Sequence, residues 1–161
     1  MSGGEGVPKE LVVKPIGTVR SPFVERADAP RQAVGAKEVL GTIELYPGHD
    51  FEHALSDLAA FSHVWVIFWF HLNEGWRPKV LPPRSAERRG VFATRAPYRP
   101  NPIGISVVKL ERIEGLVLHV SGLDMLDGTP VLDLKPYAPA FDRVDSPRVP
   151  AWFERLMEDY F

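Results

Sequence analysis

The stretch SHVWVIFWFH (62–71) contains the longest apolar run of this 161-residue chain. Apolar residues fill both its odd and its even positions, which predicts a strand that is buried on both faces at the centre of a sheet. The run is far too short to span a bilayer as a helix. We therefore expect a β-sheet core that is built around this segment.

Segments with alternating polarity and turn residues at their ends predict further strands on either side. They are LVVKPIGTVRS (11–21), GTIELYP (41–47), RGVFATRA (89–96), GISVVKLERIEG (104–115), LVLHVSGLDML (116–126) and DGTPVLDLKPY (127–137). The segments 104–115 and 116–126 are expected to form a hairpin, and the last strand follows across an Asp127-Gly128 turn. The proline inside 11–21 places that strand near an edge or a bulge.

Two short helices are expected as well. DFEHALSDLAAF (50–61) has apolar residues near helical spacing, with Asp50 as its cap. A second, amphipathic helix begins at Pro150, and its shared face carries Trp152, Leu156 and Tyr160. Residues 22–39 and 72–89 are predicted to be long loops.

Six or seven strands joined mostly by turns, with one or two short helices, favour an all-β fold in which an antiparallel sheet closes into a barrel. The length predicts a single domain over residues 10–161, after a flexible leader over residues 1–9. The chain has no cysteine, which excludes disulfides, thiolate metal sites and cysteine nucleophiles. The N-terminus has no secretion signal, so a cytoplasmic protein is expected.

The loop ATRAPYRPNPIGIS (93–106) interrupts the predicted strands with three prolines, which cannot donate to a sheet ladder. The carbonyls of Arg99, Pro100 and Asn101 have few backbone donors nearby, and the Asn101 amide offers a donor and an acceptor. Such a set could read the edge of a nucleobase, and Tyr98 could stack on its ring. A rigid structural turn is the alternative explanation of the same motif.

A basic cluster surrounds this loop. It contains Arg77, Lys79, Arg84, Arg88, Arg89, Arg95 and Arg99. Against these seven cations stands Glu87 alone, which leaves a local excess of six positive charges in a chain whose net charge is −2. Arginine forks suit phosphate and carboxylate groups, and a polyanion would bind here in a salt-dependent way. A solvated loop without a ligand explains the charges equally well.

The acidic stretch DMLDGTPVLD (124–133) is a third candidate site. Asp124, Asp127 and Asp133 could accept ribose hydroxyls or the proton of an amine, although turn chemistry also accounts for them. The histidines lack the spacing of metal ligands, because His63 and His71 would lie roughly 26 Å apart along one strand. No metal site is expected, and no dinucleotide-binding or phosphate-loop motif is present.

Five of these segments together resemble, in order, the motifs of the TsaA-like/YaeB (TrmO) family. They are PIGTVRSPF (15–23), APRQAVG (29–35), FSHVWVIFWFH (61–71), GVFATRAPYRPNPIGIS (90–106) and GLDMLDGTPVLDLKPY (122–137). The resemblance extends from Leu11 to about Asp142. It implies a small β-barrel, a homodimer, and a cofactor pocket near the subunit interface.

The resemblance also implies an activity, namely S-adenosylmethionine-dependent methylation of N6 of threonylcarbamoyl-modified adenosine 37 in tRNA. A non-catalytic module that binds S-adenosylmethionine and a methyltransferase with another substrate remain alternatives. By position, the cofactor would contact Gln32, Ala33, Val34, Phe70, His71, Arg95, Asp127, Gly128, Thr129 and Pro130. Asn101 is the first candidate for assisting the reacting amine, Asp124 is the second, and Tyr98 would stack on the base. The RNA phosphates would meet Arg77, Arg84, Arg88, Arg89 and Arg99.

Overall fold

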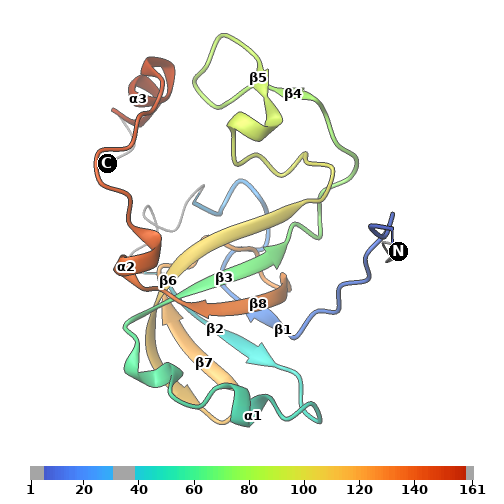
Figure 1. Cartoon of the computed structure of the whole chain (residues 1–161), viewed down its shortest axis with the longest axis vertical. Coiled ribbons are helices and arrows are strands. Elements are labelled where there is room, and N and C mark those ends of the chain that lie inside the picture. The colour runs from blue at the N-terminus through green and yellow to red at the C-terminus, as the bar shows by residue number, and fades with distance from the viewer. Residues whose placement is uncertain (1–5, 31–38, 159–161) are drawn as a thin grey trace, which may run out of the picture.

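The computed structural model describes residues 6–30 and 39–158, and its centre is a closed barrel of six strands (Figure 1). Around the barrel the strands follow the order β1 (Gly17–Arg20), β2 (Leu40–Leu45), β7 (Val117–Ser121), β6 (Ile103–Glu114), β3 (His63–Trp69) and β8 (Pro130–Pro136). All neighbours are antiparallel, and β8 closes the barrel against β1. The predicted all-β antiparallel barrel with short helices is confirmed.

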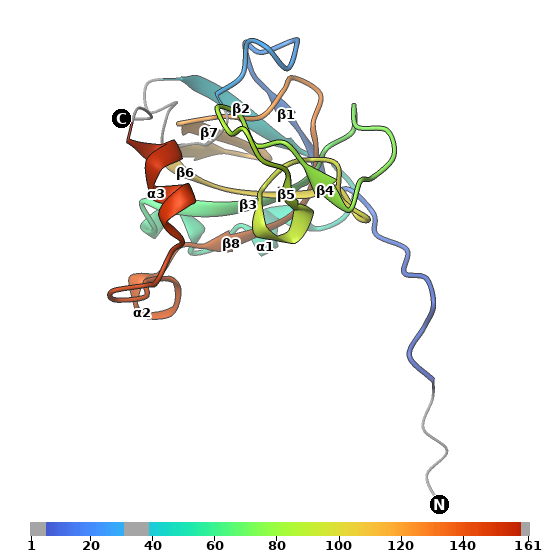
Figure 2. The same cartoon turned by 90° about the horizontal axis from the view of Figure 1, so that it is seen from above.

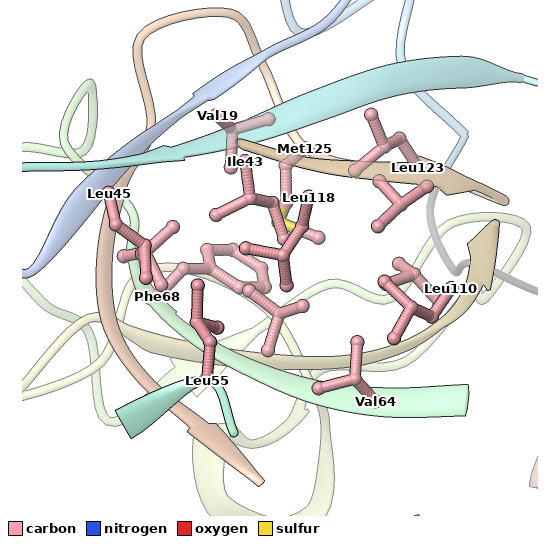
Figure 3. Close-up of a cluster of buried hydrophobic side chains, with 14 residues drawn as sticks. Val19, Ile43, Leu45, Leu55, Val64, Phe68, Leu110, Leu118, Leu123 and Met125 are labelled. Carbon is pink, nitrogen blue, oxygen red and sulfur yellow. The ribbon is translucent and has the colours of Figure 1, made fainter. Parts of the chain in front are cut away.

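Inward-pointing side chains from every strand fill the barrel (Figure 3). The largest fully buried ones are Ile43, Leu118, Leu123, Met125, Val19, Val64, Val66, Val108, Val120 and Val131. Alternation of inward and outward residues along each strand is what a small barrel requires. Gly104 has a packing role here, because a Cβ at this position would overlap the ring of Phe68. Apolar side chains therefore pack together in the interior of the barrel.

The central strand β3 pairs with β6 on one side and with β8 on the other, as expected of segment 62–71. Only its inward residues Val64, Val66 and Phe68 are buried. The outward residues, Trp65 among them, are half-buried. The expectation of burial on both faces is thus only half right, because the outer face of a barrel strand needs a separate covering layer.

The segment 89–96 is not the strand that its sequence predicts. β5 (Arg89–Gly90) pairs only with β4 (Lys79–Val80) in a separate two-stranded sheet, and a 3₁₀ helix, η3 (Val91–Ala93), follows. The Thr94 hydroxyl donates to the Val91 carbonyl at 2.9 Å. Side-chain bonds of this kind compete with a sheet ladder for the backbone groups.

The helix predicted over 50–61 is also wrong in length. It divides into α1 (Phe51–Ala54) and the 3₁₀ helix η2 (Leu58–Ala60). Asp57 lies in the left-handed region at φ 69°, which ends the first helix and redirects the chain. Asp50 makes no capping bond, because its carboxylate contacts the Nδ1 of His53 instead.

The first strand is shorter than the expected 11–21, since only Gly17–Arg20 pairs. The hairpin of β6 and β7 is confirmed, whereas β8 pairs with β1 and β3 and not with β7. The Asp127-Gly128 turn therefore carries the chain across the barrel end and does not close a hairpin.

After β8 come α2 (Pro139–Asp142) and α3 (Ala151–Met157). Trp152 and Leu156 are half-buried on α3, and Tyr160 lies outside the described residues.

The antiparallel order decides which connections lie together. β1, β7 and β3 alternate with the other three strands around the barrel, so they run in one direction. The chain segments that follow these three strands therefore leave from the same end. The described residues that the sequence predicts for the site belong to these three connections, apart from Pro130 and Asp133, which lie in β8.

Figure 2 shows the described part of the N-terminal segment extending away from the barrel. None of the described helices has the length and apolar character that crossing a bilayer requires.

Candidate functional site

The turn between β7 and β8 is fixed tightly to the barrel. The Gly128 amide donates to the Val19 carbonyl at 2.9 Å, and the buried Thr129 hydroxyl donates to the Leu126 carbonyl at 2.6 Å. Gly128 adopts φ +81°, a conformation that L side chains rarely take. The Asp127 carboxylate accepts the Ser21 amide at 3.2 Å. The amide groups of the turn thus donate to carbonyls of the protein itself, and these hydrogen bonds hold the backbone of the turn rigid at the barrel end.

The end of β3 lies beside this turn. A Cβ built on Gly128 would lie 3.9 Å from the Nε2 atom of His71, so the imidazole is next to the glycine backbone. Partial burial lowers the pKa of His71 from its ordinary value, because burial disfavours the charged ring. Burial thus favours the neutral form of the ring over the charged form. The structure brings His71 and the Asp127–Pro130 turn together, as the resemblance implies.

The prolyl loop reaches the same strand end. The Phe70 amide donates to the Pro102 carbonyl at 2.8 Å. The Phe70 ring packs edge-on against Phe68, with centroids 5.1 Å apart. The exposed Asn101 lies one residue before this contact, and its carbonyl accepts the Ile103 amide at 2.7 Å. The Asn101 carbonyl is thus used within the loop, while its side chain lies on the surface.

Arg99 holds the prolyl loop in shape. Its Nη1 donates to the carbonyls of Val91, Thr94 and Ala96 at 2.9, 2.7 and 3.3 Å. A planar guanidinium can bond several carbonyls at once, which fixes the path of a loop that has no ladder of its own. The sequence predicts Arg99 as a phosphate ligand. In the structure its Nη1 instead donates hydrogen bonds to carbonyls of the loop.

Tyr98 lies among cations. The guanidinium carbons of Arg26 and Arg77 are 5.1 and 4.7 Å from its ring centroid, within cation–π range. Arg26 also donates to the Tyr98 hydroxyl at 3.0 Å and to the Asn73 side-chain oxygen at 3.5 Å. No sequence motif indicates Arg26, because it lies in a polar loop. Only the fold brings it to the prolyl loop.

Asp124 is held from inside the barrel. The hydroxyl of Ser106 reaches its two carboxylate oxygens at 2.7 and 3.0 Å. Ser106 is 5% exposed and points inward from β6. Alternation along 104–115 could have indicated this buried hydroxyl, since Ser106 occupies an inward position among apolar residues. The pair joins β6 to the segment after β7 at the same barrel end.

The remaining arginines divide into separate groups. Arg84 and Arg88 are exposed on the segment between β4 and β5. Arg89 pairs with Glu87 at 3.1 Å. Arg95 is exposed at the start of the prolyl loop, and Gln32, Ala33 and Val34 lie outside the described residues. Within the described part of the chain, no three potential metal ligands gather in one place.

Comparison with known proteins identifies relatives over most of the chain. Residues 18–143 match the family model described as the tRNA-methyltransferase O N-terminal domain. A "Probable S-adenosyl-L-methionine-binding protein" of Pyrococcus abyssi is 46% identical over 92% of this chain and 79% of its own length. The tRNA (adenine(37)-N6)-methyltransferase of Escherichia coli K12 is 45% identical over 77% of this chain and 56% of its own length.

Solved structures agree with these relatives. The crystal structure of TrmO from Pseudomonas aeruginosa superimposes with a TM-score of 0.74 at 48% identity, covering 86% of this chain and 61% of that one. A second crystal structure of TrmO gives the same TM-score and covers 87% of this chain and 63% of that one. The chain therefore spans less than two thirds of these TrmO chains and of the E. coli relative.

Proposed function

Because this chain belongs to the tRNA-methyltransferase O N-terminal domain family, we propose that it transfers a methyl group from S-adenosylmethionine to N6 of adenosine 37 in tRNA. The favoured acceptor is the threonylcarbamoyl-modified adenosine that the sequence resemblance implies. One observation carries the proposal beyond family membership. The described motif segments that the resemblance assigns to cofactor and substrate all lie in connections at one end of the barrel.

The residues at this end suit a sulfonium nucleoside. Its cationic sulfur favours neutral and anionic surroundings, and the lowered pKa of His71 favours the uncharged form of that ring. The turn of Gly128 uses its amide for the Val19 carbonyl, so the wall beside His71 is poor in free donors. Phe70 adds a half-buried aromatic ring. We propose that His71, Phe70 and the Asp127–Pro130 turn hold the cofactor, with Gln32, Ala33, Val34 and Arg95 as further contacts.

S-adenosylmethionine supplies an electrophilic methyl group when it is bound. Transfer of the methyl group to N6 would release S-adenosylhomocysteine and the single proton of the modified N6. The protein's own contribution is to align N6 and to accept a hydrogen bond from its N–H group, because the lone pair of N6 is delocalised. The side-chain oxygen of Asn101 lies on the rigid prolyl loop and can accept this hydrogen bond. Asp124 is the second candidate, and Ser106 fixes its carboxylate. Exact alignment of the reactants supplies much of the acceleration in reactions of this kind.

Incorporation of a labelled methyl group into tRNA tests the proposal. We expect transfer from labelled S-adenosylmethionine to tRNA that carries the threonylcarbamoyl group, and little transfer to tRNA without it. Calorimetry with the cofactor alone separates binding from catalysis. Heat of binding without transfer to any RNA would instead favour a non-catalytic binding module, and transfer to another acceptor would assign another substrate.

We further propose that the chain acts as a homodimer and in the cytoplasm. The outer face of β6 supports self-association, because Ile103 and Ile105 are 43% and 45% exposed there. Exposed apolar patches of this kind often mark protein interfaces. Half-buried Trp65 and Trp69 continue the patch on β3. Light scattering of the purified protein measures the mass, and a value of one chain at micromolar concentration would contradict the dimer.

A further inference from the structure

We propose that a cationic cavity between α3 and the segment joining β4 to β5 binds an unpaired nucleotide of the RNA through its phosphate. The inference rests on the proposed function and names a second contact for its RNA substrate. The cavity measures about 380 Å³. It is lined by Arg84, Ser85, Ala86, Glu87, Arg89, Trp152, Arg155 and Leu156. Figure 1 shows α3 and the β4–β5 sheet on the same side of the barrel.

The charge of the lining favours an anion. Three arginines face one carboxylate, Glu87, and that carboxylate is already paired with the Nη2 of Arg89 at 3.1 Å. Among the described residues, Arg155 has no ion pair. Arginine forks match phosphate oxygens in geometry as well as in charge. A phosphate in the cavity would therefore meet the guanidinium of Arg155, which has no ion pair among the described residues, beside the two further arginines of the lining.

Arg89 is partly withdrawn from water. Its side chain is 28% exposed, and its Nε is buried without a hydrogen-bond partner among the described residues. Its guanidinium carbon lies 4.8 Å from the Trp152 ring centroid. Charges that are shielded from water attract a partner more strongly than exposed ones. Arg89 thus gives the cavity a fixed cation that the stacking contact holds in place.

The remaining lining favours a nucleotide over a bare phosphate ion. The volume is in the range of small-molecule sites and is larger than one phosphate requires. Trp152 is half-buried, and indole rings stack on unpaired bases without sequence preference. Single-stranded loops are the parts of RNA whose bases are free for such contacts. An unpaired nucleotide of the anticodon loop has both a phosphate for the arginines and a free base for the indole ring.

The cavity lies partly outside the part of the chain that defines the family. The family model ends at residue 143, whereas Trp152 and Arg155 belong to α3. Its other wall belongs to the same β3–β6 connection as the prolyl loop. The Arg77 amide, which donates to the Tyr98 carbonyl at 3.1 Å, ties the two ends of this connection together. The C-terminal helix therefore completes a site next to segments that we assign to the substrate.

Arg155→Ala tests the cavity directly, with Arg148→Ala as the matched control. Both arginines are exposed and lie in the C-terminal segment, but Arg148 is not part of the cavity lining. The probe is an anticodon stem-loop RNA, titrated at several salt concentrations by fluorescence anisotropy. We expect Arg155→Ala to weaken binding roughly tenfold and to reduce the slope of log Kd against log salt by about 0.7 to 1. Arg148→Ala should leave both quantities near the wild-type values.

A second set of titrations separates RNA from free nucleotides. Adenosine monophosphate should bind far more weakly than the stem-loop, and the stem-loop should quench less fluorescence in Trp152→Phe than in the wild type. Equal losses in Arg155→Ala and Arg148→Ala, or no loss in either, would overturn the inference. Equal affinity for the mononucleotide and the stem-loop would overturn it as well and assign the cavity to free nucleotides. Methyl transfer that persists with unchanged RNA affinity in Arg155→Ala would overturn the cavity alone and leave the proposed function standing.

Discussion

At the scale of single residues, the burial of His71 affects the charge of its ring, and this charge matters both for the stability of the protein and for a cationic ligand. Its lowered pKa means that the folded state favours the neutral ring. The stability that follows from this is therefore fully present above the ordinary histidine pKa of 6.5 and is lost as the pH falls below it. In the proposed cofactor site, a protonated ring would also repel the sulfonium. The same titration would then act on folding and on binding.

We expect the Kd for S-adenosylmethionine to rise as the pH falls below 6.5, the ordinary pKa of the group. His71→Gln removes the titrating group and should flatten this dependence, while weakening binding at neutral pH. Calorimetry between pH 5.5 and 8 measures the effect. His53→Gln, on α1 at the opposite end of the barrel, is the control and should keep the wild-type profile. A His71→Gln variant with the wild-type profile would assign the dependence to another group.

Asn101 offers a test of the chemistry that is separate from cofactor binding. Asn101→Ala should lower kcat by about two orders of magnitude or more, because the hydrogen-bond acceptor proposed for the N6–H group is lost. The side chain is exposed and its backbone carbonyl bond to Ile103 does not depend on it. Cofactor affinity should therefore stay within about twofold. Single-turnover methyl transfer measures the first quantity, and unchanged turnover would remove Asn101 from the mechanism.

The sequence predicts which residues lie at this end of the barrel better than it predicts which side chains contact one another. His71 and Gly128 lie side by side at the barrel end, and the family resemblance implies this proximity because it assigns both residues to one pocket. The roles of Ser106 and Arg26 were not predicted. Each contacts a residue from a distant segment, at separations of 18 and 72 positions, and no local pattern indicates such a pair. Contacts of this kind depend on how the strands are ordered in the barrel.

At the scale of elements, the β7–β8 turn should be sensitive to backbone strain. Gly128→Ala places a side chain at φ +81°, which we expect to cost about 1–2 kcal/mol of the free energy of unfolding. It should also weaken cofactor binding, since the new methyl group would lie next to the imidazole of His71. Urea unfolding measures the first effect and calorimetry the second.

Gly115→Ala is the matched control, because Gly115 also has positive φ but lies in the β6–β7 turn at the other end of the barrel. It should lose comparable stability and keep its affinity for the cofactor. If both variants lost affinity equally, the loss would follow from global destabilisation and Gly128 would have no local role.

Elements with strong alternation were predicted well, and those that depend on side-chain bonds were not. β6 follows the pattern of 104–115 closely, whereas β7 ends at Ser121 and covers only the first part of the predicted strand 116–126. In 89–96 the apolar pattern also favoured a strand, but Arg99 draws the carbonyls of Val91 and Thr94 into a compact loop. In 50–61 the helical spacing was present, but Asp57 adopts a left-handed conformation. Pattern alone does not reveal where a side chain competes for the backbone.

At the scale of the whole molecule, the barrel closes at a short seam. β1 pairs with β8 only at Gly17–Val131 and Thr18–Pro130, whereas β3 pairs with β6 along its whole length. The strand count allowed a barrel to be predicted, but the pairing of the first strand with the last could not be read from any local segment. This seam between β1 and β8 adjoins the Asp127–Pro130 turn of the proposed site, because the Val19 amide donates to the Thr129 carbonyl at 2.9 Å.

The seam should respond to the cofactor more than the rest of the barrel does. Hydrogen exchange of the free protein should be faster at Val19 than at the β3 residues Val64 and Val66, since short pairings open at lower free energy. A ligand that binds the Asp127–Pro130 turn stabilises only the closed form, so S-adenosylmethionine should slow exchange at Val19 markedly. The Leu45 amide, which donates to the Leu116 carbonyl at the opposite end, should change little. Equal slowing at Val19 and Leu45 would mean that opening is global, and the coupling between seam and site would then be refuted.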